Sequence, residues 1–327
     1  MVGRSVLVTG AGGFIGGHLA VELSRRGARV RALVHYNSRE DRGTLDWFEP
    51  EHVREIEVVS GDLRDAESVA RAVAGAETVF HLGALIAIPY SYVNPRSYVE
   101  TNVIGSFNVA QASLSAGVAR VVHASTSEVY GTAQTIPITE EHPLEAQSPY
   151  SASKIGADKL IDSFHRSYEL PATVVRPFNT FGPHQSRRAI VPTIISQALV
   201  GDQLVLGALA PRRDLTFVSD TVDGFIAAAE APAALGRTLQ LGTGIDVSVG
   251  ELVTLVGDLM GRELTVEVDP QRLRPAASEV MRLISSPRLA LELTGWSPQI
   301  DLQEGLRRTI EWIDSHASAG RVADYVI

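Results

Sequence analysis

Short apolar runs alternate with segments of helical periodicity along the first half of the chain. The apolar runs have the length and composition of strands, and they are SVLVT (5–9), RVRALV (29–34), EIEVVSG (55–61), TVFHL (78–82), RVVHAS (120–125) and ATVVRP (172–177). Segments between them, such as 14–27 and 98–118, repeat apolar residues every three or four positions and reach glycines suited to helix C-caps. This alternation predicts an α/β fold with a doubly wound parallel sheet.

The pattern changes after residue 178, where glycine and proline become frequent and the helical segments become shorter. We therefore expect a nucleotide-binding domain over 1–178 and a smaller α+β substrate-binding cap, mainly over 179–327. Segments at about 214–242 and 283–300 are expected to return to the first domain. The stretch LRPAASEVMRLISS (273–286) reads as a loop.

Composition narrows the function classes. The 327 residues include no cysteine, which excludes disulfides and thiolate chemistry. A formal charge of −9 and no dense basic run argue against a nucleic-acid surface. No signal-peptide layout and no membrane-length apolar run are present, so we expect a cytoplasmic protein. The histidines show no metal-site spacing, and we predict no metal.

The first predicted strand runs into a glycine-rich turn, TGAGGFIG, with Gly10, Gly13 and Gly16 at three-residue spacing. Glycines between a strand and a helix let backbone amides approach a pyrophosphate, and Phe14 and Ile15 would begin the helix that receives it. No Gly-Lys-Ser/Thr follows, which argues against a triphosphate P-loop. The turn predicts a Rossmann-type site for NAD(P).

The end of the second strand bears on the choice between NAD and NADP. A carboxylate for a free ribose hydroxyl is expected near Val34, and none is there. The residues present could hold a 2′-phosphate or be plain surface loop; they are His35, Asn37, Ser38 and Arg39. This favours NADP over NAD. Asp62 and Leu63, in GDLRD after the third strand, are candidates to flank the adenine.

A tyrosine and a lysine occur four residues apart in SPYSASK. Ser148 and Pro149 predict a helix start there, so Tyr150 and Lys154 lie on one face. An ammonium beside a phenol favours the phenolate, and such a tyrosine can take a hydroxyl proton while hydride leaves the same carbon. Ser125 or Thr126, at the end of the fifth predicted strand, can bind the same oxygen.

These motifs together resemble the extended short-chain dehydrogenase/reductases that modify nucleotide sugars. The resemblance covers nearly the whole chain, through TGAGGFIG, GDLRD, HLGA, NVIGSFNV, STSEVYG, YSASK, RPFNTFGP, RRDLTFVSD and LTGWSPQIDLQEGL. It implies that Tyr150 is the general base and acid, that Lys154 binds the cofactor ribose, and that Thr126 and Ser125 assist. Further cofactor contacts that it implies are Leu82, Gly83, Ala84, Asn102 and Pro177. It also implies a homodimer joined by a four-helix bundle.

Glu128, within STSEVYG, narrows the reaction further. Epimerases of this branch usually carry a small or hydroxyl residue there, and 4,6-dehydratases carry glutamate. A carboxylate over C5 of a 4-keto hexose can remove the acidified proton so that the C6 hydroxyl leaves as water. The dTDP-glucose enzymes have an aspartate where this chain has Ser127, so STSE resembles GDP-mannose 4,6-dehydratases more closely.

UDP-glucuronate decarboxylases share STSE, and a 4-epimerase, a 5,6-dehydratase or a non-catalytic NAD(P)-binding protein also stay open. The mostly apolar ALIAIPYSYVNP favours an uncharged C6 or an N-acetyl group. With STSEVYGTAQ and PYSASKIGADKL it resembles the LegB-type dehydratases, which act on nucleotide-linked N-acetylglucosamine; the nucleotide here would be UDP or GDP. The candidate substrate contacts are Ile88, Tyr90, Ser91, Asn179, Arg188, Val191, Pro192, Arg213 and Arg274.

Overall fold

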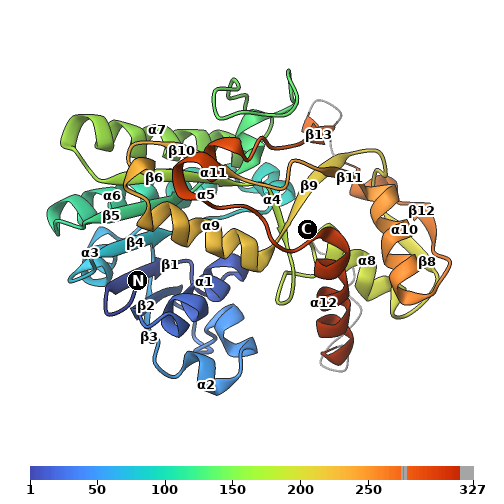
Figure 1. Cartoon of the computed structure of the whole chain (residues 1–327), viewed down its shortest axis with the longest axis horizontal. Coiled ribbons are helices and arrows are strands. Elements are labelled where there is room, and N and C mark those ends of the chain that lie inside the picture. Colours follow the sequence, from blue (N-terminus) through green and yellow to red (C-terminus); the bar gives the residue numbers. More distant parts are fainter. Residues whose placement is uncertain (274, 276–277, 317–327) are drawn as a thin grey trace.

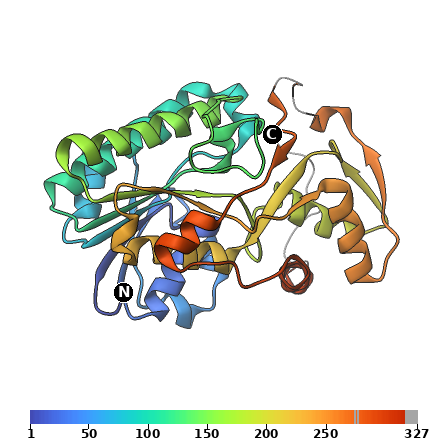
Figure 2. The ribbon, with the colours of Figure 1, turned by 45° about the horizontal axis from the view of Figure 1, so that its top comes forward.

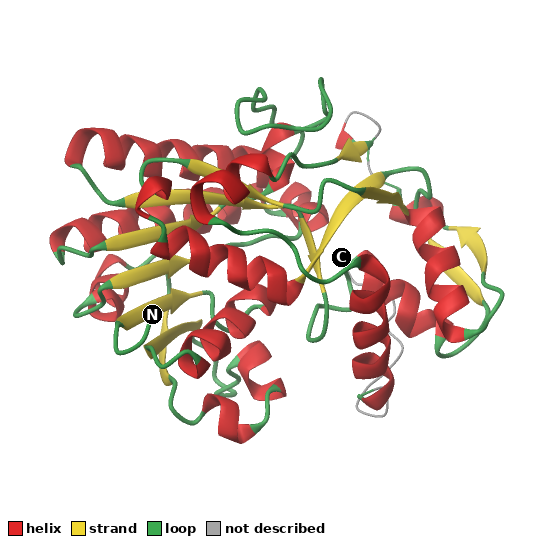
Figure 3. Ribbon diagram, in the orientation of Figure 1, coloured by secondary structure: helices red, strands yellow, loops and turns green. Residues whose placement is uncertain are grey.

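The computed structural model describes residues 1–273, 275 and 278–316. Its main layer is a seven-stranded parallel sheet with helices on both faces (Figure 1, Figure 3). In spatial order the strands are β10 (Thr238–Leu241), β6 (Ala172–Pro177), β5 (Arg120–Ala124), β4 (Thr78–His81), β1 (Ser5–Thr9), β2 (Arg29–His35) and β3 (Glu57–Gly61). The order reverses between β1 and β4, which confirms the doubly wound sheet predicted from the alternating pattern.

Side-chain alternation in β1 explains the two helical layers. Val6 and Val8 face one buried cluster, and Leu7 faces the other. The first cluster is covered by α1 (Phe14–Arg25), α9 (Val218–Glu230) and α11 (Arg288–Thr294), and the second by α3 (Ala66–Val73), α6 (Gly105–Ser115) and α7 (Pro149–Tyr168). Since both faces are covered, the central strands are largely buried, and their polar residues, such as His81 and His123, are buried with them.

A second part of the chain lies beyond the carboxyl ends of the parallel strands (Figure 2). Its strands are β7 (Asn179–Phe181), β8 (Gln203–Leu206), β9 (Arg212–Phe217), β11 (Asp246–Ser248), β12 (Thr265–Val268) and β13 (Arg282–Leu283). β9 pairs with β7, β11 and β13, and β8 pairs with β12. Its helices are α8 (Ile190–Ala198), α10 (Val249–Met260) and α12 (Leu302–Ser315). The segment expected to be a loop therefore contains a two-residue strand, β13, paired with Arg212 and Arg213.

Short helical elements connect the larger ones. They are η1 (Gly43–Trp47), α2 (Pro50–Val53), α4 (Ile88–Val93), α5 (Pro95–Tyr98), η2 (Val99–Ile104), η3 (Ser127–Tyr130), η4 (Pro232–Ala234) and η5 (Pro270–Arg272). The element η2 is a turn of π-helix that leads directly into α6. Such turns are rare and occur mostly at functional sites, so this one draws attention to its buried residue, Asn102.

An aromatic and histidine cluster joins α1 to the second part of the chain. The His184 ring lies 4.9 Å from that of His18, 4.3 Å from Phe48 and 4.7 Å from Trp312 on α12. His184 Nδ1 is 3.2 Å from His18 Nε2, and His18 Nε2 is 3.0 Å from the Pro183 carbonyl. Burial lowers the pKa of His18 to about 4 and that of His184 to about 3, so both rings are neutral near pH 7.

Candidate active site

The turn between β1 and α1 is packed too tightly for side chains. Gly10 has φ +70°, and a Cβ there would lie 2.7 Å from the backbone of Gly83 at the end of β4. A Cβ on Gly16 would lie 2.2 Å from the Gly10 carbonyl oxygen. α1 begins at Phe14, so the amides of Phe14 and Ile15 have no acceptor within their own helix. These groups fit the pyrophosphate of a dinucleotide.

Gly16→Ala is expected to weaken NAD(P) binding about tenfold or more, because the methyl group must displace the turn that cradles the pyrophosphate. The Kd for each cofactor, measured by calorimetry, checks this. Gly201→Ala is the matched control, since a Cβ there meets nothing within 4 Å. Unchanged binding by Gly16→Ala would show that the turn does not hold the cofactor.

The residues proposed for the cofactor ribose lie together at the end of β2. His35, Ser38 and Arg39 are exposed. The Asn37 side chain is engaged within its own loop, where it accepts from the Arg39 amide at 3.0 Å and donates to the Asp41 carbonyl at 2.7 Å. A carboxylate does approach from the neighbouring strand, because Asp62 Oδ2 lies 3.8 Å from His35 Nε2.

Tyr150 occupies the first turn of α7. Ser148 and Ser151 form a capping box there and Pro149 follows the cap, as the sequence predicts. The Tyr150 side chain is 7% exposed and packs with Ile88 and Tyr98. Its hydroxyl is hydrogen-bonded to Thr126.

The Thr126 hydroxyl is held by its position as a cap. It accepts from the Glu128 amide at 3.2 Å, at the start of η3. Thr126 therefore is the hydroxyl that reaches Tyr150. Ser125, the other candidate, points away, because its Oγ donates to buried Asp158 at 2.8 Å.

The state of Tyr150 differs from the prediction that Lys154 lowers its pKa. Burial raises the pKa of the Tyr150 phenol above its ordinary value, the Thr126 hydrogen bond opposes the rise, and the Glu128 carboxylate adds to it. Lys154 instead donates from Nζ to the Ala124 carbonyl at 2.7 Å. Burial lowers the pKa of Lys154 to about 8, and Asp158 opposes that change. At pH 7 the lysine is therefore still charged.

Asn102, on the π-helical turn, fastens three segments together. Its Oδ1 accepts from the Leu85 amide at 2.8 Å, and its Nδ2 donates to the Leu85 carbonyl and to Ser153 Oγ, both at 2.9 Å. Ser153 precedes Lys154 on α7. Asn102 thus fixes the loop after β4 against α7, and both polar atoms of its side chain are engaged in doing so.

Glu128 and Ser127 lie side by side on η3 but in different surroundings. Ser127 is 3% exposed, whereas Glu128 is half-buried. The Glu128 carboxylate is close enough to raise the pKa of Tyr150. In the part of the chain that the structure describes, its carboxylate makes no hydrogen bond or ion pair. A nearby carboxylate without a partner suits a base.

The candidate substrate contacts differ in how exposed their side chains are. Tyr90 is 37% exposed on α4, Asn179 is partly exposed on β7, and Arg188 is exposed before α8. Other candidates have buried side chains, and their contact with substrate stays a prediction. Ser91 is fully buried and donates to the Ile88 carbonyl at 2.6 Å, and Val191 is 1% exposed within the core beside buried Pro192.

The arginines proposed for the diphosphate have unequal surroundings. Arg213 on β9 is 3.6 Å from Glu279 Oε1 and donates to the Arg212 carbonyl at 2.9 Å. Arg274 lies outside the described residues. Within those residues, no group of three histidine or acidic side chains is arranged to hold a metal ion, and no helix has the length and apolarity to cross a membrane.

Sequence reasoning missed the groups beneath Lys154. Asp158 and Arg176 are buried and paired, with Nη2 to Oδ2 at 2.9 Å. Arg176 also donates to the Tyr130 hydroxyl at 2.9 Å. A signal for Asp158 was present, since it follows Tyr150 and Lys154 at the same four-residue spacing and so shares their helix face.

A parallel sheet that reverses order beside a glycine turn, with Tyr150, Lys154 and Thr126 at its carboxyl edge, defines an extended short-chain dehydrogenase/reductase. Comparison with known proteins identifies the branch: residues 7–309 match the family described as GDP-mannose 4,6 dehydratase. The chain belongs to that family of nucleotide-sugar-modifying enzymes, which confirms the resemblance seen in its motifs.

Two relatives and one solved structure show the range of reactions nearby. The chain is 33% identical over 312 residues to a UDP-glucose 4-epimerase of Mycolicibacterium smegmatis, covering 94% of this chain and 97% of the relative. It is also 33% identical to a dTDP-glucose 4,6-dehydratase of Streptomyces antibioticus, covering 94% and 92%. The dTDP-glucose 4,6-dehydratase DesIV of Streptomyces venezuelae, solved with NAD and TYD bound, superposes with a TM-score of 0.84 at 29% identity, covering 97% and 98%.

Proposed function

We propose that the protein is a nucleotide-sugar 4,6-dehydratase that uses NAD(P) and forms a 4-keto-6-deoxy sugar. The observation that carries the proposal is the position of Glu128. Its carboxylate lies close enough to the Tyr150 phenol to raise the pKa of that phenol, and it has no hydrogen-bond or ion-pair partner among the described residues. An oxidation at C4 needs Tyr150 alone as a base, whereas elimination across C5 and C6 needs a second one.

Tyr150 and Thr126 serve the oxidation. The Thr126 hydroxyl and the phenol both bind the C4 oxygen, and Tyr150 takes the hydroxyl proton as hydride leaves C4. NAD(P), when bound, would supply the acceptor and later the donor of this hydride. Lys154, charged at neutral pH and one helical turn from Tyr150, favours the phenolate once substrate and cofactor enclose the site.

Glu128 serves the elimination. It removes the C5 proton, which the new C4 ketone has acidified, and the C6 hydroxyl leaves. Hydride returns to C6 and a proton returns to C5. The lost water consists of the C6 hydroxide and one proton, which balances the proton taken from the C4 hydroxyl. The hydride taken from C4 ends on C6, so no net oxidation occurs.

The substrate that fits best is UDP- or GDP-linked N-acetylglucosamine. Residues 86–94, of which Ile88 packs against Tyr150, contain no charged side chain, so they favour an uncharged C6. Asn179, Arg188 and Arg213 are the proposed diphosphate contacts. His35, Ser38 and Arg39 support a preference for NADP over NAD, which competition between the two cofactors measures.

A panel of UDP-, GDP- and dTDP-hexoses, with and without the N-acetyl group, tests this function. Each product is scored by mass for loss of water. A substrate deuterated at C4 then locates the hydride: deuterium at C6 identifies 4,6-elimination, and deuterium retained at C4 identifies 5,6-elimination. Products of unchanged mass from every sugar would reject dehydration.

Epimerisation at C4 is the second candidate, because the M. smegmatis relative is named as a UDP-glucose 4-epimerase. Tyr150, Thr126 and Lys154 suffice for that reaction. It would give a product of unchanged mass and altered C4 configuration. Decarboxylation of a UDP-glucuronate, another possibility that the motifs leave open, would instead release carbon dioxide in the same panel.

We also propose a homodimer through η2, α6 and α7. Val99, Ile104 and Phe107 are 51%, 45% and 40% exposed, although they are large and apolar. Phe107→Asp is expected to convert the dimer to monomer in sedimentation experiments. Val200→Asp, at a 68% exposed apolar position on another surface, should leave the mass unchanged. A monomeric parent protein would contradict the proposal.

A further inference from the structure

A single buried carboxylate lies beneath the catalytic residues. Asp158 is 3% exposed, one helical turn beyond Lys154 on α7. Its Oδ2 accepts from Ser125 Oγ at 2.8 Å and from Arg176 Nε and Nη2 at 3.1 and 2.9 Å. Its Oδ1 lies 3.5 Å from His123 Nε2. Asp158 therefore joins α7 to the ends of β5 and β6, on the side of the sheet that carries Lys154.

Asp158 is a buried anion near two cations, and the histidines around it are neutral. Burial lowers the pKa of His123 and of His81 on β4, so both rings are neutral. Lys154 and Arg176 are the cations. On its own, burial would raise the pKa of Asp158, but His123, Arg176 and Lys154 together hold it below its ordinary value.

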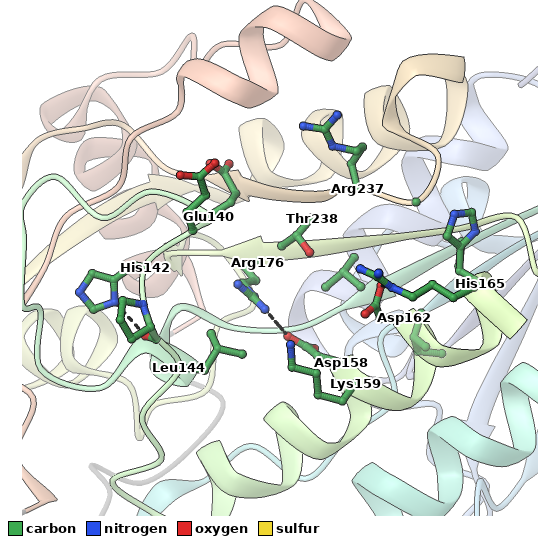
Figure 4. A pocket seen from close by; sticks show the side chains of 17 residues that line it. Glu140, His142, Leu144, Asp158, Lys159, Asp162, His165, Arg176, Arg237 and Thr238 are labelled. Atoms are coloured by element: carbon green, nitrogen blue, oxygen red, sulfur yellow. Dashed lines mark hydrogen bonds and ion pairs between the residues drawn. The ribbon is translucent and has the colours of Figure 1, made fainter.

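The remaining ionisable groups near this site face Tyr150 or Arg176 and make no hydrogen bond to Asp158 among the described residues. On η3, Glu128 faces Tyr150, and Tyr130 takes the Arg176 hydrogen bond. Glu140 reaches Arg176 from the loop before α7, and burial raises the pKa of that carboxyl. A cavity of about 360 Å³ lies behind the pair, lined by Glu140, Arg176 and Arg237 (Figure 4). Asp158 also lines this cavity, whereas Lys154 does not.

We propose that Asp158 is a positioning residue that keeps Lys154 protonated in its buried site, and that Arg176 competes with Lys154 for the charge of Asp158. A buried ammonium with one backbone acceptor needs a nearby anion, and Asp158 is the carboxylate that its own helix places one turn away. The hydrogen bond from Ser125 to Asp158 also turns the Ser125 hydroxyl away from Tyr150 and leaves Thr126 to act. The inference rests on the proposed function only in its use of Lys154 as the support of Tyr150.

The lysine content of the chain makes a direct test possible. Lys154 and Lys159 are its only lysines. Lysine labelled with ¹³C at the ε position therefore gives two NMR signals, one from the buried site and one from exposed Lys159, which is the internal reference. Lys159→Arg assigns them. The titration of Lys154 is then followed without any substrate.

Two variants are expected to move that titration in opposite directions. Asp158→Asn removes the anion and should lower the titration midpoint of Lys154 by about one unit or more, and Arg176→Met removes the competing cation and should raise it. Asp158→Glu should restore the parent value. Asp162→Asn is the matched control, since this residue lies one turn further along α7 and pairs with Arg166 at the surface.

Turnover provides the second readout. The pH above which turnover falls should decrease with Asp158→Asn by the same amount as the midpoint of Lys154. Midpoints that stay at the parent value in both variants, or that move in the same direction, would overturn the proposal. If Asp158→Asn does not fold, the upward shift in Arg176→Met decides alone. A lack of turnover with every sugar would reject the proposed function and leave the Lys154 titration valid.

Discussion

Glu128→Gln is expected to stop water loss while the oxidation at C4 continues. The amide cannot take the C5 proton, and loss of a general base costs about 10²- to 10⁴-fold in rate. Tyr150 and Thr126 are untouched, so a single turnover should accumulate reduced cofactor, visible by absorbance, while mass spectrometry shows no dehydrated sugar. Because glutamine has nearly the same shape and no partner of Glu128 is lost among the described residues, folding should be unaffected.

Glu145→Gln is the control for this result. Glu145 is an exposed carboxylate in the loop that follows η3, and its backbone amide already bonds the Val129 carbonyl at 2.9 Å. Water loss by that variant should match the parent rate. Retained dehydration in Glu128→Gln would remove Glu128 from the chemistry, and simultaneous loss of cofactor reduction would indicate that it shapes the site and is not the base.

Tyr150→Phe is expected to abolish every step, since no later step can begin without the ketone. The loss should again be about 10²- to 10⁴-fold or larger. The ring would remain in its apolar pocket against Ile88 and Tyr98, and Thr126 would keep its bond from the Glu128 amide. Cofactor reduction in a single turnover is the measurement, because it reports the first step alone.

Tyr168→Phe makes a matched comparison on the same helix. Tyr168 is 57% exposed at the far end of α7, so its hydroxyl has no access to the site. The Kd for the cofactor should be the same in both variants. Reduced cofactor appearing at the parent rate in Tyr150→Phe would mean that another group takes the C4 proton.

The first half of the fold follows from local patterns. The predicted strands at 5–9, 29–34 and 172–177 occur almost residue for residue, because each is a buried parallel strand with a glycine or proline nearby. The strand β10 was not among the predicted strands, although it lies within the segment at about 214–242 that was expected to return to the first domain. The domain boundary at 178 and the cytoplasmic location stay predictions.

The site was predictable where it depends on helical spacing and not where it depends on contacts between elements. Tyr150 and Lys154 share a helix face as expected, and the glycine turn meets β4 as a close approach of backbones. Ser91 and Ser125 both donate to acceptors within the protein, which sequence position alone does not reveal, because a hydroxyl can satisfy an internal acceptor as well as a ligand. The pKa of Tyr150 was misjudged because burial outweighs its neighbours.

The ring cluster around His184 has a mechanical consequence. It fastens α12 to α1, the helix whose first amides are the proposed pyrophosphate contacts, so any shift of α12 relative to α1 must break these ring contacts. On α4, Tyr92 contacts Ser278 of the second part of the chain. In the proposed reaction the dinucleotide is reoxidised in every turnover and need not leave, so a fixed contact between α1 and α12 would not hinder that cycle.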